Sequence, residues 1–339
     1  MIKRGFKIFI GLLILLCLFN CKSICYGIEQ GVGQLKIVWK AKPLKDYLND
    51  DNYPDSLKAK IRLIEEIKQF SVDSLGIYPS KNYTKMYDQK GRPGMYVVTA
   101  CEPYDLIPYQ WSFPIVGKFS YKGFFKKRKA VNEALSLEKE GYDTDVGEVN
   151  AWSTLGWFKD PVMSSMLEKT EGQLARVLIH ELTHGTIFVK NDVQFNENLA
   201  SFIGDKGALL FLKHKYSEDS EIIKTYLDEL SDLQKIRAHM HRAAEELKEF
   251  YKEKQGQKPT KEKKEKIQKI LSDMDTLSLN SYQKVRNMQA MKDTLNNTFF
   301  TDFLMYREDQ KILEKTFSED FGGDFNLYFN HLKARYTTL

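Results

Sequence analysis

Hydrophobic residues recur at helical spacing along most of the chain and alternate in only a short region. Residues 28–75 follow a helical period that breaks at Asn49–Tyr53 and resumes after Pro54, a residue suited to the first turn of a helix. Residues 83–100 alternate and turn through Gly91–Gly94, a pattern that predicts a β-hairpin. We therefore expect a small sheet after an N-terminal helical scaffold.

The next part of the chain combines both patterns. An aromatic passage over residues 109–125 leads into a helix that is predicted through Ala130, Ala134 and Leu137. Residues 146–161 are strand-like, and their aromatic side chains are most simply core residues. A helix-rich part with a few strands is the expected result.

The second half of the chain is helical. Residues 217–250 and 260–291 are long, charged and helical, and the sequence QGQKP joins them, which predicts a helical hairpin that projects from the core. Its charge runs are most simply solvated helix surfaces. Residues 296–339 return to an apolar-rich helical pattern that we expect to pack back on the preceding part. The predicted fold class is α+β, predominantly helical, with a small sheet and a long helical hairpin.

The sequence HELTH begins at His180 and carries the candidate chemistry. His180 and His184 are four residues apart, so on a helix they lie one turn above each other and can bind one metal ion. Glu181 lies beside this pair and suits a general base that accepts a proton from a water activated by zinc. Thr170 and Gln173 fit a capping box that would start the helix. The buried face of this helix is predicted to consist of Leu174, Val177, Leu178 and Leu182.

A catalytic zinc ion needs a third protein ligand and one open position. The best candidate is Glu197, at the start of a second amphipathic helix whose beginning is marked by a turn at Asn191-Asp192 and a possible cap at Asn196. Asp192 and Asp205 are the alternative ligands. We therefore expect one zinc ion on His180, His184 and Glu197.

The composition restricts the function classes only broadly. The 339 residues are 42% hydrophobic and 29% charged, which is typical of a globular protein with one large domain or two small ones. The net charge of +5 is partly due to the basic N-terminus and a Lys-rich segment near residue 260. No nucleic-acid-binding motif occurs, so no nucleic-acid partner is predicted.

The N-terminus combines a basic start with an apolar run over residues 8–19, which indicates a membrane-targeting segment. The run is short for a spanning helix, and three fates are open: a signal peptide cleaved near Tyr26-Gly27, a lipoprotein signal with Cys21 lipidated, or a retained anchor. We favour a membrane-tethered protein that faces outside the cytoplasm. A disulfide between Cys25 and Cys101 is permitted there, but their spacing does not support it.

Further candidate residues lie on either side of the histidine pair. A strand before such a helix is where substrate backbone pairs in zinc peptidases of this type, so residues 150–153 are candidates for the cleft. A tyrosine donor from a later segment often stabilises the oxyanion, and Tyr306 is the candidate here. Asn296 and Asn297 are further candidate cleft residues.

Several long segments resemble one known family. QWSFPIVGKFSYKGFF, GYDTDVGEVNAWSTLGWFKDP and IHELTHGTIFVKNDVQFNENLASFIGDKGA occur in this order, and the similarity extends to YGIEQGVGQLKIVWKAKPL and LNNTFFTDFLMY. The chain thereby resembles the putative aminopeptidase family of exported, membrane-tethered bacterial HExxH proteins. The resemblance implies a gluzincin-like zinc peptidase of the cell envelope with His180, His184 and Glu197 as ligands, Glu181 as base and a peptide substrate.

Four parts of the chain are expected on these grounds. They are a signal or membrane anchor (1–27), a zincin-like catalytic domain (28–216), the charged hairpin (217–295) and a C-terminal helical segment that packs on the catalytic part (296–339). The alternatives to an aminopeptidase are an endopeptidase or amidase that acts on envelope peptides, and a non-catalytic envelope protein that keeps zinc for structure. Glu181 argues against the last of these, because a structural site needs no base.

Overall fold

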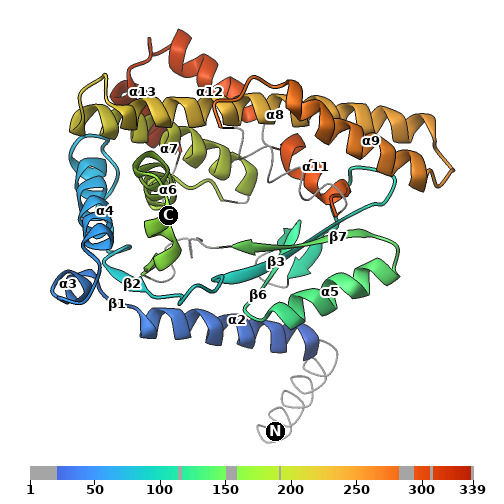
Figure 1. Cartoon of the computed structure of the whole chain (residues 1–339), viewed down its shortest axis with the longest axis horizontal. Coiled ribbons are helices and arrows are strands. Elements are labelled where there is room, and N and C mark those ends of the chain that lie inside the picture. The colour runs from blue at the N-terminus through green and yellow to red at the C-terminus, as the bar shows by residue number, and fades with distance from the viewer. Residues whose placement is uncertain are drawn as a thin grey trace, which may run out of the picture.

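The computed structural model describes residues 21–113, 117–149, 159–190, 192–281, 294–305 and 308–336. Helices dominate this part of the chain, and small sheets lie among them (Figure 1). The predicted α+β, predominantly helical fold class is therefore confirmed. No helix within these ranges is both long and apolar enough to cross a membrane.

Three helices begin the described chain. They are α2 (Cys21–Lys40), α3 (Leu44–Leu48) and α4 (Asp55–Asp73). The predicted break lies between α3 and α4, and Pro54 immediately precedes α4, where its fixed φ suits a helix start. Ile61, Ile64 and Ile67 of α4 are fully buried. The helical prediction for this region is thus confirmed.

The strands form two three-stranded sheets and a two-stranded one. The first sheet, in the order β1-β2-β8, consists of β1 (Lys42–Pro43), β2 (Lys85–Tyr87) and β8 (Val162–Met163). The second, in the order β6-β3-β7, consists of β6 (Tyr121–Phe124), β3 (Met95–Cys101) and β7 (Asp143–Val149) and is antiparallel. The third pairs β4 (Trp111–Phe113) with β5 (Gly117–Phe119).

The hairpin predicted over residues 83–100 is wrong. Strands do occur on both sides of the turn at Lys90 and Gly91, where φ is 52° and 70°, but β2 and β3 belong to different sheets. Met86 of β2 is fully buried in the main core, whereas Val98 of β3 is buried in another cluster. Burial in two separate cores therefore directs the two strands apart, although a turn joins them in sequence.

One face of the β6-β3-β7 sheet is covered by α5 (Lys127–Lys139). Val98 and Phe124 point to this face and pack in one cluster with three α5 residues. Those residues are Ala130, Ala134 and Leu137, as the sequence predicts. On the opposite side of the sheet, α11 (Asn297–Met305) lies against β3 and β7 (Figure 1).

The centre of the main core is the helix pair α6 (Glu171–His184) and α7 (Val193–Lys215). Leu174 and Leu178 of α6 are fully buried, as are Ile203 and Leu212 of α7. The 3₁₀ helix η1 (Ser164–Glu168) leads from β8 into α6. This pair carries the histidine motif and the proposed third ligand, so its packing positions the candidate site.

The long helix α8 (Glu221–Glu253) runs along the edge of the molecule opposite α2 (Figure 1). Its first half packs in the main core through Ile223 and Tyr226. Its second half packs through Met240 and Leu247 in a second core with α9 (Thr260–Asp273) and α11 (Asn297–Met305). One helix thus connects the two cores.

The helix predicted over residues 260–291 is shorter than the pattern suggests. Helix α9 ends at Asp273, the 3₁₀ helix η2 (Met274–Thr276) follows, and the chain continues without helix to residue 281. The buried carboxylate of Asp232 on α8 accepts hydrogen bonds from the backbone N–H of Asn280 and of Ser281, both at 2.8 Å. This interaction holds the chain in a non-helical conformation against α8.

The described chain ends with α12 (Glu308–Glu319) and α13 (Phe325–Arg335). Tyr328 and Phe329 of α13 are buried in the main core together with α6 and α7. No disulfide joins Cys25 and Cys101, since Cys25 is exposed on α2 and Cys101 is buried on β3. The boundaries predicted at residues 27, 216 and 295 stay predictions.

Candidate metal centre

Helix α6 starts and ends close to the limits that its sequence indicates. The hydroxyl oxygen of Thr170 caps the helix by accepting a hydrogen bond from the N–H of Gln173 at 3.2 Å. The side chain of Gln173 does not return to the cap but donates to Glu229 on α8 at 2.8 Å, so only half of the predicted capping box forms. His180 and His184 lie in the last turns of the helix, one above the other.

The start of α7 differs by a few residues from the prediction. Asp192, not Asn196, is the N-cap, and its carboxylate accepts from the N–H of Phe195 at 3.0 Å. Asn196 lies inside the helix and braces the preceding loop, because its side chain both accepts from the N–H of Val189 and donates to its carbonyl oxygen, each at 2.8 Å. These bonds fix how α7 turns back towards α6.

Glu197, Ser201 and Gly204 lie on one stripe of α7, at steps of four and three residues. At Gly204 a Cβ atom would lie 2.9 Å from the carbonyl oxygen of Arg176 and 3.2 Å from Cβ of His180, so only glycine permits this approach of the two helices. Ser201 Oγ lies 3.4 Å from Nδ1 of His180. Gly204 thus allows α7 to approach α6 closely, with the stripe that includes Glu197 facing the histidines.

The three predicted ligands converge. Nε2 of His180 and Nε2 of His184 are 3.3 Å apart. The carboxylate of Glu197 lies 3.3 Å from the first nitrogen and 3.4 Å from the second. These three residues are a group that can hold a metal ion, with one donor atom from each within 4.8 Å of the others. The structure therefore brings together the three residues that the sequence predicts, and their role as ligands stays a prediction.

The two alternative ligands have other roles. Asp192 caps α7, as described above. Asp205 forms an ion pair with Arg176 on α6, and its backbone carbonyl accepts from the hydroxyl of Tyr226 at 3.1 Å. Both aspartates thus stabilise the helix pair that carries the donors, and neither belongs to the group of donors.

Glu181 lies in a strongly desolvated position next to the donors. Burial raises the pKa of its carboxyl to about 7, and the negative charges of Glu197 and Asp160 act in the same direction, while His180 opposes them. A carboxyl with a pKa near neutrality can accept a proton and give it up again at the pH at which most enzymes work. The electrostatic environment therefore suits a general acid–base.

Two buried residues that sequence reasoning missed adjoin Glu181. Asp160 as a residue is 3% exposed, and its backbone carbonyl oxygen accepts a hydrogen bond from the N–H of Tyr83 at 2.7 Å. The φ angle of Tyr83 is 58°, an uncommon value for a bulky residue. Burial raises the pKa of Tyr83, and the charges of Glu181 and Asp160 raise it further. The positive φ of the buried Tyr83 is the structural feature that singles it out, and no pattern in the sequence predicts this backbone conformation.

The donor side chains differ in their preferred protonation. Burial, followed by the charge of His180, lowers the pKa of His184 to about 4, so this ring is neutral at pH 7. Burial alone would raise the pKa of Glu197, but its hydrogen bond with His180 and the charges of both histidines lower it overall. A neutral imidazole and an ionised carboxylate are the forms that bind metals.

Tyr121 on β6 is a further residue that sequence reasoning missed. Burial of its phenol raises its pKa, and the charge of Glu197 raises it further, which links the sheet electrostatically to the donor group. Tyr121 pairs with Thr99 on β3, and Thr99 pairs with Asp145 on β7. Directly paired residues point to the same face of a sheet. These three side chains therefore form a row on the face that α5 leaves uncovered.

The same face of the sheet borders a groove of about 230 Å³. Thr99 and Asp145 line it together with Asn296, which precedes α11. A larger cavity of about 550 Å³ lies against Tyr83 and Leu182, but none of the three donor residues lines it. The three donor residues do not line the groove either, and what connects its sheet face to them is the effect of the charge of Glu197 on Tyr121.

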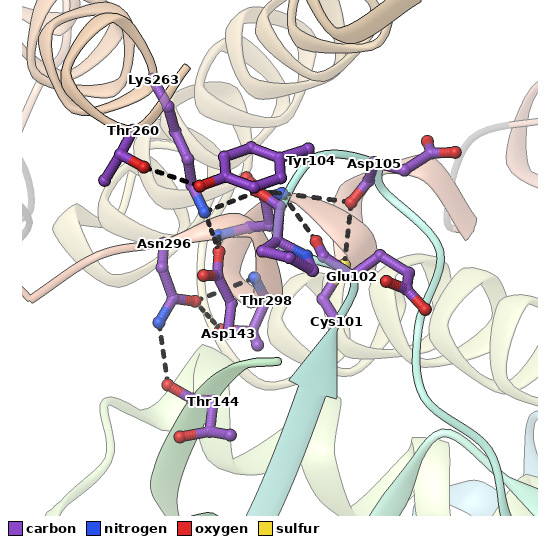
Figure 2. A network of polar contacts seen from close by, with 12 residues as sticks. Cys101, Glu102, Tyr104, Asp105, Asp143, Thr144, Thr260, Lys263, Asn296 and Thr298 are labelled. Carbon is purple, nitrogen blue, oxygen red and sulfur yellow. Dashed lines mark hydrogen bonds and ion pairs between the residues drawn. The ribbon is translucent and has the colours of Figure 1, made fainter. Parts of the chain in front are cut away.

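The other predicted site residues lie elsewhere or outside the described residues. Asn297 is fully buried in a polar network at the end of the sheet, the surroundings of which are drawn in Figure 2. Its amide nitrogen donates to the carbonyl oxygen of Glu102 at 2.9 Å. Asn296 donates to the carbonyl oxygen of Thr144 at 2.8 Å. Tyr306 and residues 150–153 fall outside the described residues, so their predictions stay open.

A family model described as putative aminopeptidase matches residues 25–337, which is most of the chain. The chain belongs to the putative aminopeptidase family. The match includes the helix pair, the β6-β3-β7 sheet and the helices that pack on them. Membership suggests peptidase activity, and it agrees with the resemblance that the sequence segments indicate. No curated protein and no solved structure matches the chain.

Proposed function

We propose that this member of the putative aminopeptidase family is a zinc-dependent peptidase in which His180, His184 and Glu197 hold one zinc ion and Glu181 is the general base. The observation that carries the proposal is the triangle of donor side chains. The two Nε2 atoms are 3.3 Å apart, one oxygen of Glu197 lies 3.3 Å from Nε2 of His180, and the other lies 3.4 Å from Nε2 of His184. Two nitrogens and one carboxylate are a common ligand set of catalytic zinc, which leaves a fourth position open.

The size of the triangle supports zinc in particular. Donor atoms at ~2.0–2.1 Å from a tetrahedral zinc ion stand about 3.3 Å from one another. The 3.3 Å between the two Nε2 atoms equals this edge, and each nitrogen has one oxygen of Glu197 at 3.3 or 3.4 Å. At 3.3 Å, at most one of the two facing Nε2 atoms can carry a hydrogen without a clash, so a cation between them relieves the contact.

Zinc bound at such a site polarises the scissile carbonyl and makes a nearby water more acidic. The carboxylate of Glu181 accepts a proton from the attacking water and delivers it to the nitrogen of the leaving amine. Burial, together with the charges of Glu197 and Asp160, raises the pKa of Glu181 to about 7 in the metal-free chain, which supports a carboxyl that can both accept and release a proton. Glu197 and the two histidines keep the donor group in place.

The substrate side of the proposal rests on the open sheet face. Strand β6 is at the edge of its sheet within the described residues, and its Tyr121 faces the charge of Glu197. We assign to the 46%-exposed side chain of Tyr121 the role of donor to the oxyanion, in competition with the predicted Tyr306.

The preference for amino termini rests on the family description, whereas the proposed envelope location rests on the apolar N-terminal segment. An endopeptidase or amidase would use the same donors and the same base. A pair of peptides that differ only in an acetyl group on the amino terminus separates these activities. An aminopeptidase cleaves only the peptide with the free amine, whereas cleavage of both at similar rates identifies an endopeptidase.

The central test compares two variants of the donor group. Glu181→Gln removes the base but none of the donors, so we expect bound zinc to stay at one ion per chain and kcat to fall by about 10²–10⁴-fold. His184→Ala removes a donor, so bound zinc should fall together with activity. Zinc is measured by elemental analysis of the purified protein. Full activity of Glu181→Gln, or undiminished zinc in His184→Ala, contradicts the proposal.

The two tyrosines are compared by removing one hydroxyl at a time. We expect Tyr121→Phe to lower kcat about 10²-fold with little change in KM, because an oxyanion donor acts mainly in the transition state. Tyr306→Phe is the matched control. If Tyr306→Phe has the large effect and Tyr121→Phe has none, the oxyanion role belongs to Tyr306, as the sequence predicts.

A further inference from the structure

Helix α2 carries a row of apolar side chains on the face that points away from the protein. Ile28 is 62% exposed, Val32 61%, Leu35 37% and Trp39 80%. Their spacing of four, three and four residues places them on one stripe of the helix. Single exposed apolar residues are common on protein surfaces, but a continuous exposed row indicates an interaction surface.

The face that α2 turns towards the protein combines polar contacts with the apolar residues Ile37, which is 3% exposed, and Tyr26, which packs against Phe113. Gln30 donates to the carbonyl oxygen of Gly123 at 3.1 Å, and Glu29 forms an ion pair with Lys129 on α5. At Gly33 a Cβ atom would lie 2.1 Å from the ring of Phe125, so the helix backbone rests directly on the domain. These contacts fix the rotation of the helix about its axis, so the apolar row of Ile28, Val32, Leu35 and Trp39 stays on the outside.

A basic border accompanies the apolar row. Lys36 and Lys40 are exposed on one flank of α2, and Lys42 is exposed just beyond it. The carboxylate of Glu29 is engaged by Lys129, so it does not offset these charges. An apolar helix face with lysines on its flank and a tryptophan in the row fits the headgroup region of an anionic bilayer.

The position of α2 agrees with this partner. The helix forms one outer edge of the molecule, next to α5 and opposite α8 (Figure 1). In the sequence only Asn20 separates α2 from the apolar run of residues 8–19. The ion pair of Glu29 joins α2 to α5, on which Val131 and Leu135 are 36% and 47% exposed. The apolar row thus begins where the chain is expected to meet a membrane.

We infer that α2 is an interfacial helix, which lies in the plane of an anionic membrane surface with Ile28, Val32, Leu35 and Trp39 among the acyl chains. The helix docks the domain in a fixed orientation, whichever form the N-terminal attachment takes. A tether alone would instead let the domain tumble above the bilayer. This inference concerns a surface remote from the donor group and stands whether or not the protein is a peptidase.

The test measures contact between Trp39 and lipid in the full chain. The protein is placed in vesicles of phosphatidylcholine and phosphatidylglycerol in equal amounts, with and without bromine on the acyl chains, which quenches tryptophan on contact. The difference from Trp39→Phe isolates the signal of Trp39. A second reporter, Ile28→Trp in the Trp39→Phe background, reads the other end of the row, about 16 Å away along the helix.

An interfacial helix gives strong and similar quenching at both positions. Quenching at position 28 but not at position 39 means that α2 leaves the bilayer, and this overturns the inference. Protection of Trp39 from water without quenching by brominated lipid, increasing with the ratio of protein to lipid, indicates a second copy of the chain as the partner and overturns it too.

A matched pair of substitutions tests the apolar row itself. Ile28→Glu and Ile312→Glu both alter an isoleucine that is 62% exposed, but Ile312 lies on α12, away from α2. We expect Ile28→Glu to shift the docking equilibrium about tenfold towards the undocked state, read as lost quenching of Trp39, because one large apolar side chain leaves the lipid. Ile312→Glu should leave the quenching unchanged. Equal effects of both substitutions contradict the inference.

Discussion

The donor group and the polar network around Asn297 both gather buried polar side chains, but they differ in how these are paired. In the network, Lys263 donates to Asp143 at 2.5 Å and to the carbonyl oxygen of Pro103 at 2.8 Å (Figure 2). Asn297 accepts from the hydroxyl of Tyr251 at 2.7 Å and donates through its amide to backbone carbonyls. Each donor of this network faces an acceptor.

The donor group has no such match. Two imidazole nitrogens and a carboxylate point at one another, and His184 is neutral at pH 7 because burial lowers its pKa to about 4. Protons are too few to satisfy all three contacts. The comparison teaches that a network of matched partners holds the fold together, whereas a cluster of potential metal ligands without matched partners supports the proposed cation site.

The largest effect is expected from breaking the matched network. Lys263→Met leaves the carboxylate of Asp143, whose side chain is 16% exposed, without its cation. We expect the free energy of unfolding to fall by roughly 3 kcal/mol, because an unpaired buried charge is costly. Denaturant titration measures it, and the affinity for zinc should stay unchanged because the network is separate from the donors.

The control for that substitution lies on the same helix. Lys269 pairs with Asp273 at 2.6 Å, but the two side chains are 73% and 44% exposed. Lys269→Met breaks a solvent-exposed ion pair instead of a buried one, so we expect no measurable change in stability. If both substitutions have equal effects, burial of the pair does not explain the difference, and the comparison fails.

The second effect is stabilisation by the cation that the donor group is proposed to bind. After removal of metal with a chelator, addition of zinc at about 100 times its dissociation constant should raise the stability of the wild-type chain by about 2.7 kcal/mol. The rise should vanish in His184→Ala and persist in Lys263→Met. Thermal unfolding with and without zinc measures it. A chain that zinc does not stabilise has no preformed metal site, which contradicts the proposed role of the triangle.

The sequence predicted the donor group because its geometry is local. His180 and His184 are one helical turn apart, and Glu197 follows within one loop and the first turns of the next helix. Helical spacing is therefore enough to align the two histidines. The cap was assigned to Asn196 instead of Asp192, since both residue types favour that position and the role of Asn196 in bracing Val189 depends on the folded loop.

The polar network could not be predicted in this way. The backbone of Asn297 donates to Asp143, 154 residues earlier in the chain, and its side chain donates to Pro103, 194 residues earlier. No local pattern joins such partners. For the same reason, Asn297 was predicted to line the cleft, and β2 and β3 were predicted to pair with each other although their partners lie elsewhere in the sequence.

Helix α2 shows a different limit. Its amphipathic pattern predicts a helix, and the structure contains one, but the pattern does not say which face packs on the domain. The usual rule places apolar residues inside, whereas Gln30 and Gly33 face the domain and Trp39 faces outwards. Only the contacts of the folded chain assign the faces.

The smallest expected effect is the release of a proton from Glu181 when zinc binds. In the protein without metal its pKa is raised to about 7 by burial, above the ordinary value of 4.5. At pH 7 the carboxyl is thus about half protonated, and a nearby divalent cation favours the charged form and lowers the pKa. Zinc binding should therefore release about half a proton more from the wild type than from Glu181→Gln. As the pH falls from 7 to 5, the carboxyl of Glu181 becomes almost fully protonated in the metal-free protein. The difference in proton release should then grow towards one proton, provided that zinc still binds.

Calorimetric titration of zinc into the metal-free protein, repeated in buffers of different ionisation enthalpy, counts the released protons. His184, with a pKa of about 4, is already neutral and adds nothing at pH 7. Subtracting the Glu181→Gln result removes the protons that come from any other group common to both proteins. Equal release from the two proteins would mean that the carboxyl of Glu181 is either ionised before zinc binds or too far away to respond. An ionised carboxylate could still act as the base, so equal release contradicts the raised pKa of Glu181, while its role as base is decided by the turnover of Glu181→Gln.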